Sequence, residues 1–345
     1  MQLLKSLVKE LNLLRFFYKD DIRTDFTGAL VDNRPEEEKK DDIHFKDIVA
    51  SANAVVWKEK KEWRTFPKLD QWQSFMCGAN VLAKAMGVSF FLKFGTYINF
   101  SRADIYQRRF NRPSPGMTLA DLFRIASEGV TLEQLTPKEI YTDADADTLL
   151  IESYKRKVGE VFSVSGGVYL PSDMETMASV IQTTEKAIIL LTFFNSKEWS
   201  REYPLVIDTK LKVTDGLRHF VAAVDFGLVN GKKHLKIEDS AKFGGLYERK
   251  LDEEWVSRRV YGAGYLMNFK FQVGVGDRPT YDGMTIISTQ KCLRFEGLFP
   301  INIDYFENLG PSTRIAIKAF QKKYSLAETS QLDAGTQNKL RQLFP

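Results

Sequence analysis

The spacing of apolar positions predicts a long helix that begins near residue 75. From Phe75 to Met86 the apolar residues recur every three or four positions, and Gly87 follows as a stop signal. Asp70 and Ser74 are candidate caps, so Cys77 is expected in or near the first turn. Unpaired backbone N–H groups and the positive end of the helix dipole favour a thiolate over a thiol at that position.

Two further apolar runs, residues 219–226 and 234–240, predict a β-hairpin. Asn230-Gly231 lies between them and is a strong signal for a two-residue turn. This turn places Asp239 opposite Ala222, roughly 10 Å along the strand from His219. Strict alternation puts His219 and Asp239 on opposite faces of the hairpin. A bulge near residues 225–228 is therefore needed to bring the two side chains together.

These elements carry the residue types that a cysteine-dependent catalytic site needs. Cys77 would attack, His219 would serve as its base, and Asp239 would orient the imidazole ring. Gln71 lies six residues before Cys77, where its side-chain amide could stabilise an oxyanion beside the sulfur. The alternative is that Cys77 is a buried structural cysteine, since free cysteine is among the most buried residue types.

Residues 54–270 resemble a divergent papain-like cysteine peptidase, because the candidate residues occur in that family's order. Gln71 and Cys77 match its oxyanion-hole glutamine and its nucleophile, at the family's six-residue spacing. Arg218-His219-Phe220-Val221 matches the catalytic histidine, and Glu238-Asp239-Ser240 stands where the family has Asn-Ser-Trp. The resemblance implies an α+β, two-lobed fold with a helical lobe and an antiparallel β lobe. It also implies hydrolysis of peptide bonds.

The chain departs from the family at several positions around these residues. Phe75-Met76 replaces Gly-Ser before the nucleophile, and Gly78 replaces the tryptophan after it. Asp239 replaces asparagine, and its charge should favour the imidazolium form of His219. Ala241 stands where the family has a tryptophan that shields the asparagine, and the family's disulfides are absent. The variant pattern resembles papain-like peptidases of bacteriophages and uncultured bacteria.

Residues 1–53 form an extension before the papain-like domain, which we expect to span residues 54–275. Leucines at positions 3, 4, 7, 11 and 14 follow helical spacing. Three interpretations are open for this extension. It could pack on the catalytic domain as an amphipathic helix, lie on a membrane surface, or act as a short inhibitory prosegment.

Residues 284–345 follow a Gly- and Pro-containing break and predict a separate three-helix domain. Residues 313–324 resemble the "T-x-x-A-[VI]-x-x-F-Q" helix of small peptidoglycan-binding domains, and residues 332–336 resemble the entry to that family's last helix. Such a domain would hold the enzyme at the cell wall, or would only brace the fold. Its expected core consists of Ile315, Ile317, Ala319, Phe320, Leu340 and Leu343.

Composition and the absence of certain motifs exclude several classes of protein. The chain has 345 residues, 43% of them apolar, and its two cysteines are too few for a disulfide framework. No zinc spacing, phosphate loop or dinucleotide fingerprint occurs, so no metal, cofactor or nucleic-acid partner is expected. No apolar run is long enough to span a membrane. We see no signal-peptide pattern, which favours a cytoplasmic or virion-associated protein, with release by lysis or injection.

The sequence thus predicts a cysteine endopeptidase acting on protein or on cell-wall peptide, the latter with help from its terminal domain. The alternative is a catalytically silent papain-fold protein with a structural or binding role.

Overall fold

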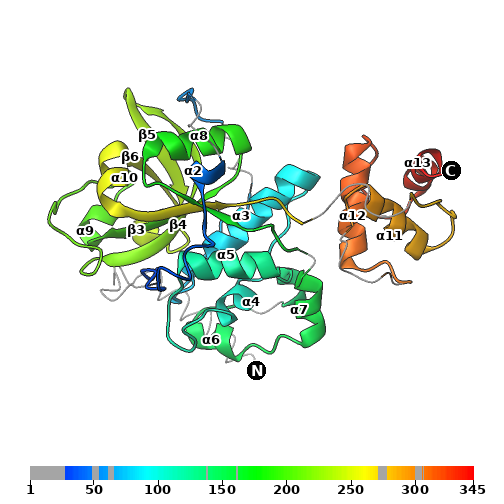
Figure 1. Ribbon diagram of the computed structural model, residues 1–345, viewed down its shortest axis with the longest axis horizontal. Helices are drawn as coiled ribbons and strands as arrows, with labels where there is room; N and C mark the ends of the chain where they lie inside the picture. The colour runs from blue at the N-terminus through cyan, green and yellow to red at the C-terminus, as the bar shows by residue number, and fades with distance from the viewer. Residues whose placement is uncertain are drawn as a thin grey trace, which may run out of the picture.

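The computed structural model describes residues 28–48, 54–60, 66–136, 139–160, 162–270, 278–299, 305 and 307–345. The leucine pattern of residues 1–18 lies outside the described residues. The described chain forms a helical lobe and a β-sheet lobe on either side of one central helix, followed by a separate group of C-terminal helices (Figure 1). The expected two-lobed α+β fold is therefore confirmed.

The helical lobe is built around α3 (Cys77–Phe94), which begins at Cys77. Most of its residues are buried, because the helix is apolar on nearly all sides and packs between the two lobes. Its N-cap is Met76, which makes no side-chain capping bond, so neither Asp70 nor Ser74 caps the helix. The other elements of this lobe are α4 (Arg102–Gln107), α5 (Leu119–Glu128), η2 (Glu133–Leu135), α6 (Asp143–Thr148) and α7 (Ser153–Glu160).

The second lobe is a seven-stranded sheet in the order β1-β2-β7-β3-β4-β5-β6, in which only the β1–β2 pair is parallel. Helix α3 packs on one face, while α8 and α10 contribute to the apolar core on the other. The strands are β1 (Ile43–His44), β2 (Gly167–Leu170), β3 (Ile188–Phe194), β4 (Leu217–Val229), β5 (Lys232–Glu238), β6 (Glu248–Asp252) and β7 (Val260–Leu266). The helices of this lobe are α2 (Phe45–Ile48), α8 (Met174–Thr184), α9 (Ser196–Trp199), η3 (Phe243–Gly245) and α10 (Glu253–Arg259).

A bulge in β4 sets the register of the predicted hairpin. From the Asn230-Gly231 turn back to the Asp225–Lys236 pair, the register is the one that the turn predicts. The register then shifts between Ala223 and Asp225, a few residues earlier than the sequence suggested, and Ala222 pairs with Glu238. Asp239 consequently comes level with Val221, two residues from His219 and on the same face of the strand.

A buried ion pair joins the two lobes directly behind this hairpin. Lys84 lies two turns beyond Cys77 on α3, and its ammonium is 2.8 Å from the Glu238 carboxylate at the end of β5. Lys68 reaches the other oxygen of Glu238, also at 2.8 Å. Because Lys84 and Glu238 are both buried, this network fixes α3 against the strand end that carries Asp239.

The C-terminal unit consists of α11 (Ile286–Phe295), α12 (Pro311–Lys323) and α13 (Ala334–Leu343). Its core includes Ile317, Phe320 and Leu340, as expected, together with the buried Cys292. Ile315 and Ala319 were expected in the same core, but they pack instead against the apolar core of the catalytic lobes.

The C-terminal unit meets the helical lobe at the end of α3. The ammonium of Lys322 donates to the Gly95 carbonyl at 2.5 Å and lies 5.0 Å from the centre of the Phe91 ring. The α12 face that carries Ile315 and Ala319 therefore forms the contact between the two units.

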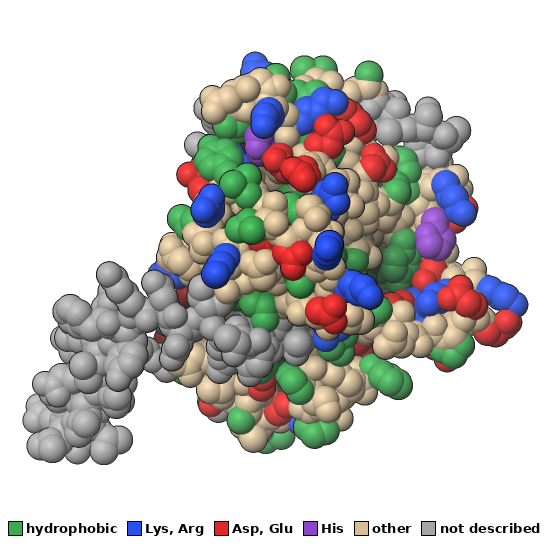
Figure 2. Space-filling model, turned by 90° about the vertical axis from the view of Figure 1, so that its left-hand side faces the viewer, with side chains coloured by type: hydrophobic (Ala, Val, Ile, Leu, Met, Phe, Trp, Pro, Cys, Tyr) green, Lys and Arg blue, Asp and Glu red, His purple; other side chains and the backbone are tan. Residues whose placement is uncertain are grey.

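Among the described residues, no helix is both long and apolar enough to cross a membrane. Basic and acidic side chains are interspersed over the face seen in Figure 2.

Candidate active site

Cys77 lies at the N-terminal end of α3, beneath the end of β4 that carries His219. Its side chain is fully buried, and the Sγ atom is 4.0 Å from the Phe75 carbonyl oxygen. The thiol is close enough to the His219 ring to contribute to the raised pKa of that histidine.

His219 connects Cys77 to Asp239. Its Nε2 atom lies 2.7 Å from Asp239 Oδ1. Burial alone would lower the pKa of His219. The carboxylate of Asp239 and the neighbouring Cys77 outweigh this effect and raise the pKa to about 9. The ring is therefore held as an imidazolium at neutral pH.

Asp239 is buried and accepts four hydrogen bonds. Oδ1 accepts from His219 and from the Ala241 backbone N–H at 2.8 Å. Oδ2 accepts from the Trp199 indole at 2.8 Å and from the Arg249 guanidinium at 2.6 Å. Burial works against the charged carboxylate, but His219, Arg249 and Trp199 together keep the pKa of Asp239 below its ordinary value. The carboxylate is thus fixed in both charge and orientation.

Trp199 and Arg249 are the residues that sequence reasoning missed. Ala241 stands where the papain-like resemblance implied a shielding tryptophan, and Trp199 of α9 instead places an indole beside Asp239. Its ring packs edge-on to His219, with ring centres 6.4 Å apart. Arg249 of β6 is also buried, and its Nε donates to the Trp199 carbonyl at 2.9 Å. No spacing in the sequence linked these two residues to the site.

Gln71 is held at the junction of the two lobes. Its side-chain nitrogen donates to the Ser74 carbonyl at 2.9 Å, and its side-chain oxygen accepts from the Ser240 hydroxyl at 2.8 Å. The Gln71 backbone N–H also donates to the Ser240 carbonyl. The amide nitrogen carries two hydrogens, and the Ser74 bond uses one of them. Gln71 thus ties the loop before Cys77 to the residue that follows Asp239.

Close packing around Gly78 limits the size of the residue at that position. A Cβ atom on Gly78 would lie 3.2 Å from Met117 Cβ and 3.3 Å from the Phe220 ring. The position after Cys77 therefore has no room for a large side chain, which accounts for the glycine.

The described segment that begins at Gly28 passes directly beside Cys77 and bonds to both lobes. A Cβ atom on Gly28 would be only 2.5 Å from the Cys77 Sγ, so only glycine lets the backbone pass this close. The Gly28 carbonyl accepts from the Met117 N–H at 3.0 Å, and the Leu30 N–H donates to the Met117 carbonyl at 2.7 Å. These bonds form a parallel bridge with the helical lobe.

The same segment is bonded to the sheet lobe through Ala29. The Ala29 N–H donates to the carbonyl of Arg218, the residue before His219, at 3.4 Å. Its carbonyl accepts from the Tyr261 hydroxyl at 3.1 Å, and its side chain is fully buried. The segment thus bridges both walls of the groove and covers the Cys77–His219 pair.

The His219 pKa gives a testable pH dependence of stability. Because this pKa is about 9 in the folded state and about 6.5 in an unfolded chain, the imidazolium stabilises the fold fully below about pH 6.5. That contribution is lost as pH rises through about 9. Urea unfolding at a series of pH values should show the stability advantage of wild type over His219→Gln shrinking between pH 6 and 10. A constant difference would contradict the assigned ionisation.

Comparison with known proteins supports the fold. Xylellain, a cysteine protease from Xylella fastidiosa, matches with a TM-score of 0.55 at 15% identity, over 71% of this chain and 97% of that one. Digestive procathepsin L2 proteinase from Tenebrio molitor larval midgut matches with a TM-score of 0.52 at 16% identity, over 77% and 91% of the two chains. No curated protein matches the chain.

The C-terminal helices were compared separately. Residues 283–340 match the family model described as a putative peptidoglycan binding domain. The resemblance to bacteriophage proteins stays a prediction. Among the described residues, no group of three or more His, Cys, Asp or Glu side chains could hold a metal ion. The matches to the two solved proteases and to the family model show that the chain has the papain-like cysteine protease fold, followed by a putative peptidoglycan binding domain.

Proposed function

We propose that the chain is a cysteine endopeptidase that uses Cys77 as nucleophile and His219 as proton carrier. The observation that carries this proposal is the buried His219–Asp239 pair, in which Nε2 lies 2.7 Å from Oδ1, together with a Cys77 thiol near enough to help raise the pKa of the ring. A structural cysteine needs no such partner. A histidine whose pKa is raised to about 9 favours the thiolate–imidazolium pair at neutral pH.

The reaction then follows from the geometry. The Cys77 thiolate attacks the carbonyl carbon of the peptide, and the His219 imidazolium gives its proton to the leaving amine. The resulting thioester is hydrolysed by water, from which His219 takes the proton. The backbone N–H of Cys77 and the second amide hydrogen of Gln71 would stabilise the oxyanion in both steps. Asp239 orients the ring and stabilises its positive charge.

The substrate is a peptide bond, either in protein or in the peptide stems of peptidoglycan. We would digest a proteome-derived peptide library and, in parallel, purified peptidoglycan, with Cys77→Ala as the blank. Cleavage products in one set, absent from the blank, would identify the substrate class. No product in either set, with Cys77 accessible to alkylation, would instead favour a catalytically silent protein.

We propose that residues 284–345 target the enzyme to peptidoglycan and take no part in the chemistry. The contact between this unit and the catalytic lobes lies at the C-terminal end of α3, about 25 Å from Cys77 by the rise of an 18-residue helix. A chain that ends at Lys270 should therefore cleave a soluble peptide within about twofold of the full-length rate, yet no longer sediment with peptidoglycan sacculi.

The thermal midpoint of both proteins should be recorded as a control, because the deletion exposes the surface around Phe91. Equal sedimentation of the full-length and shortened proteins would leave only a bracing role for the C-terminal unit.

A further inference from the structure

Arg249 is a buried cation that lies against the carboxylate bonded to the His219 ring. Its Nη1 atom donates to Asp239 Oδ2 at 2.6 Å, whereas His219 bonds to the other oxygen, Oδ1. The side chains of Arg249 and Asp239 are both fully excluded from solvent. Because a buried charge without a partner is strongly destabilising, the guanidinium and the carboxylate depend on each other.

The buried pair coincides with a departure from the papain-like pattern, which has a neutral asparagine where this chain has Asp239. With an asparagine, the site would hold only a Cys77 thiolate and a His219 imidazolium, whose charges cancel. The aspartate adds a negative charge in a place that water does not reach. The guanidinium of Arg249 adds a positive charge beside it, so the four groups together are again neutral.

Two further carboxylates near the site have cationic partners of their own. Glu238 on β5 lies 2.8 Å from the ammonium groups of Lys84 and Lys68. Glu198 on α9 lies 2.6 Å from the guanidinium of Arg259. These pairs neutralise their own carboxylates, and they are left unaltered in every variant described below.

The remaining ionisable neighbours do not replace Arg249. Arg218 precedes His219 on β4, and the alternation of a strand turns its side chain to the opposite face. Burial raises the pKa of Tyr261 on β7 above its usual range, so its hydroxyl stays neutral. In the part of the chain that the structure describes, Arg249 is the only cationic side chain besides His219 that bonds to Asp239.

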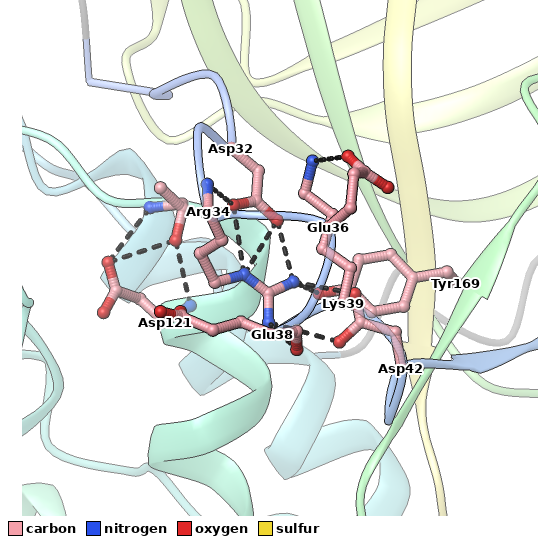
Figure 3. A network of polar contacts seen from close by, with 9 residues as sticks. Asp32, Arg34, Glu36, Glu38, Lys39, Asp42, Asp121 and Tyr169 are labelled. Atoms are coloured by element: carbon pink, nitrogen blue, oxygen red, sulfur yellow. Dashed lines mark hydrogen bonds and ion pairs between the residues drawn. The ribbon is translucent and has the colours of Figure 1, made fainter.

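The cluster around Arg34 offers a contrast near the surface (Figure 3). There one guanidinium meets two carboxylates, Asp32 at 2.8 Å and Asp42 at 2.7 Å. These three side chains are 16% to 27% exposed, so solvent screens the excess negative charge. At Arg249, where no solvent reaches either partner, one guanidinium meets one carboxylate. Charge balance is thus kept where burial requires it.

We propose that Arg249 is a positioning residue that compensates the charge of Asp239, so that the two side chains together take the place of a neutral asparagine. The proposal rests on the proposed function in naming Cys77 and His219 as the pair whose charges are preserved. The carboxylate can then orient and stabilise the imidazolium without making the buried site negative. Arg249 acts on the ring only through Asp239.

Loss of either partner alone should move the His219 pKa in opposite directions. Arg249→Met deletes a positive charge beside the carboxylate, so the His219 pKa should rise by about one unit or more from its value of about 9. Asp239→Asn leaves the guanidinium beside a neutral amide. That unbalanced charge and burial both disfavour the imidazolium, so the His219 pKa should fall below its ordinary value of about 6.5.

NMR of histidine-labelled full-length protein can follow this ionisation, because the chain has only three histidines. The signal of His219 is identified by its loss in His219→Gln, and the signals of His44 and His234 serve as internal references. A titration in each variant gives the His219 pKa directly. The measurement needs neither a substrate nor turnover.

Arg249→Lys is the matched control, because it keeps the positive charge and loses the planar guanidinium. In wild type that group also donates to three backbone carbonyls, those of Trp199, Phe243 and Leu246. Lysine and methionine both disturb these bonds, so the difference between the two variants isolates the charge. The His219 pKa in Arg249→Lys should stay within about half a unit of wild type. If Arg249→Met does not fold, Arg249→Gln, whose amide can still donate to a carbonyl, takes its place.

A double variant tests the compensation directly. Combining Arg249→Met with Asp239→Asn removes both charges and leaves the neutral arrangement of the papain-like pattern. Its His219 pKa should be about one unit or more above that of Asp239→Asn alone, and it should hydrolyse peptide about tenfold faster, since one pKa unit changes the imidazolium population tenfold. Its urea midpoint should also lie above the value obtained by adding the two single losses.

The outcomes separate this role of Arg249 from the proposed enzyme. A raised His219 pKa in Arg249→Met, with little change in Arg249→Lys, supports the compensation whether or not peptide is cleaved. Those same shifts in a protein that hydrolyses no peptide would remove the peptidase and leave the charge-balanced pair. An equal His219 pKa in wild type, Arg249→Lys and Arg249→Met would reduce Arg249 to a packing role. Purely additive losses in the double variant would also overturn the compensation.

Discussion

Replacing Cys77 by Ala is expected to abolish peptide hydrolysis, lowering kcat/KM by on the order of 10⁴-fold or more. Without the sulfur no thioester can form, and the remaining donors would act only on a substrate attacked by water. The assay should use protein in which Cys77 has been shown to react with iodoacetamide, so that a buried sulfur is not mistaken for a lost nucleophile. Initial rates on a substrate identified from the peptide library would provide the measurement.

The chain supplies its own matched control for this prediction. Cys292 is the only other cysteine, and it is buried in the core of the C-terminal unit. Cys292→Ala should reduce stability slightly and leave the hydrolysis rate within about twofold, since it removes a small apolar contact far from the site. Residual hydrolysis above one per cent of the parent rate in Cys77→Ala, in protein shown by mass to be uncontaminated, would sink the assignment of the nucleophile.

Local sequence signals were sufficient where the fold depends on short-range chemistry. The apolar spacing after Phe75 located the start of α3, but the expected stop at Gly87 was wrong, because the helix continues to Phe94 and is capped by Gly95. The Asn230-Gly231 turn located the hairpin and its register as far as Asp225. The need for a bulge followed from the two-residue period of a strand, although its position was a few residues off. Local turn chemistry does not specify where a strand bends, because bending depends on what packs on both faces of the sheet.

Long-range partners were beyond the reach of the sequence. Arg249 and Trp199 approach Asp239 from β6 and α9, and no periodicity connects those segments to the hairpin. The closure of the site by residues 28–31 was likewise hidden, since the contact of Gly28 with Cys77 involves no local pattern. A buried carboxylate required some compensating donor, but its identity is decided only by tertiary packing.

Asp239→Asn should slow hydrolysis by about 10²-fold or more, while retaining more activity than Cys77→Ala. In wild type both carboxylate oxygens face hydrogen-bond donors, His219 and Ala241 on one side and Trp199 and Arg249 on the other. An amide offers only one acceptor atom, so one side must meet an NH₂ group. The lost negative charge also removes the main interaction that holds the His219 pKa near 9. Burial would then favour the neutral ring.

The pH profile distinguishes this electrostatic role from general damage to the fold. The alkaline limb of kcat/KM in wild type should fall near pH 9, where His219 loses its proton, and should move to lower pH in Asp239→Asn. Asp225→Asn is the matched control. Like Asp239, Asp225 is a buried aspartate, and it lies on β4. One oxygen of its carboxylate accepts two hydrogen bonds, from the Lys60 and Phe226 backbone N–H groups, and an asparagine oxygen can keep both. The pH profile of kcat/KM for Asp225→Asn should match that of wild type. A lowered rate in Asp239→Asn with an unmoved alkaline limb would mean that another group sets the charge of His219, and that Asp239 only supports the packing around Arg249.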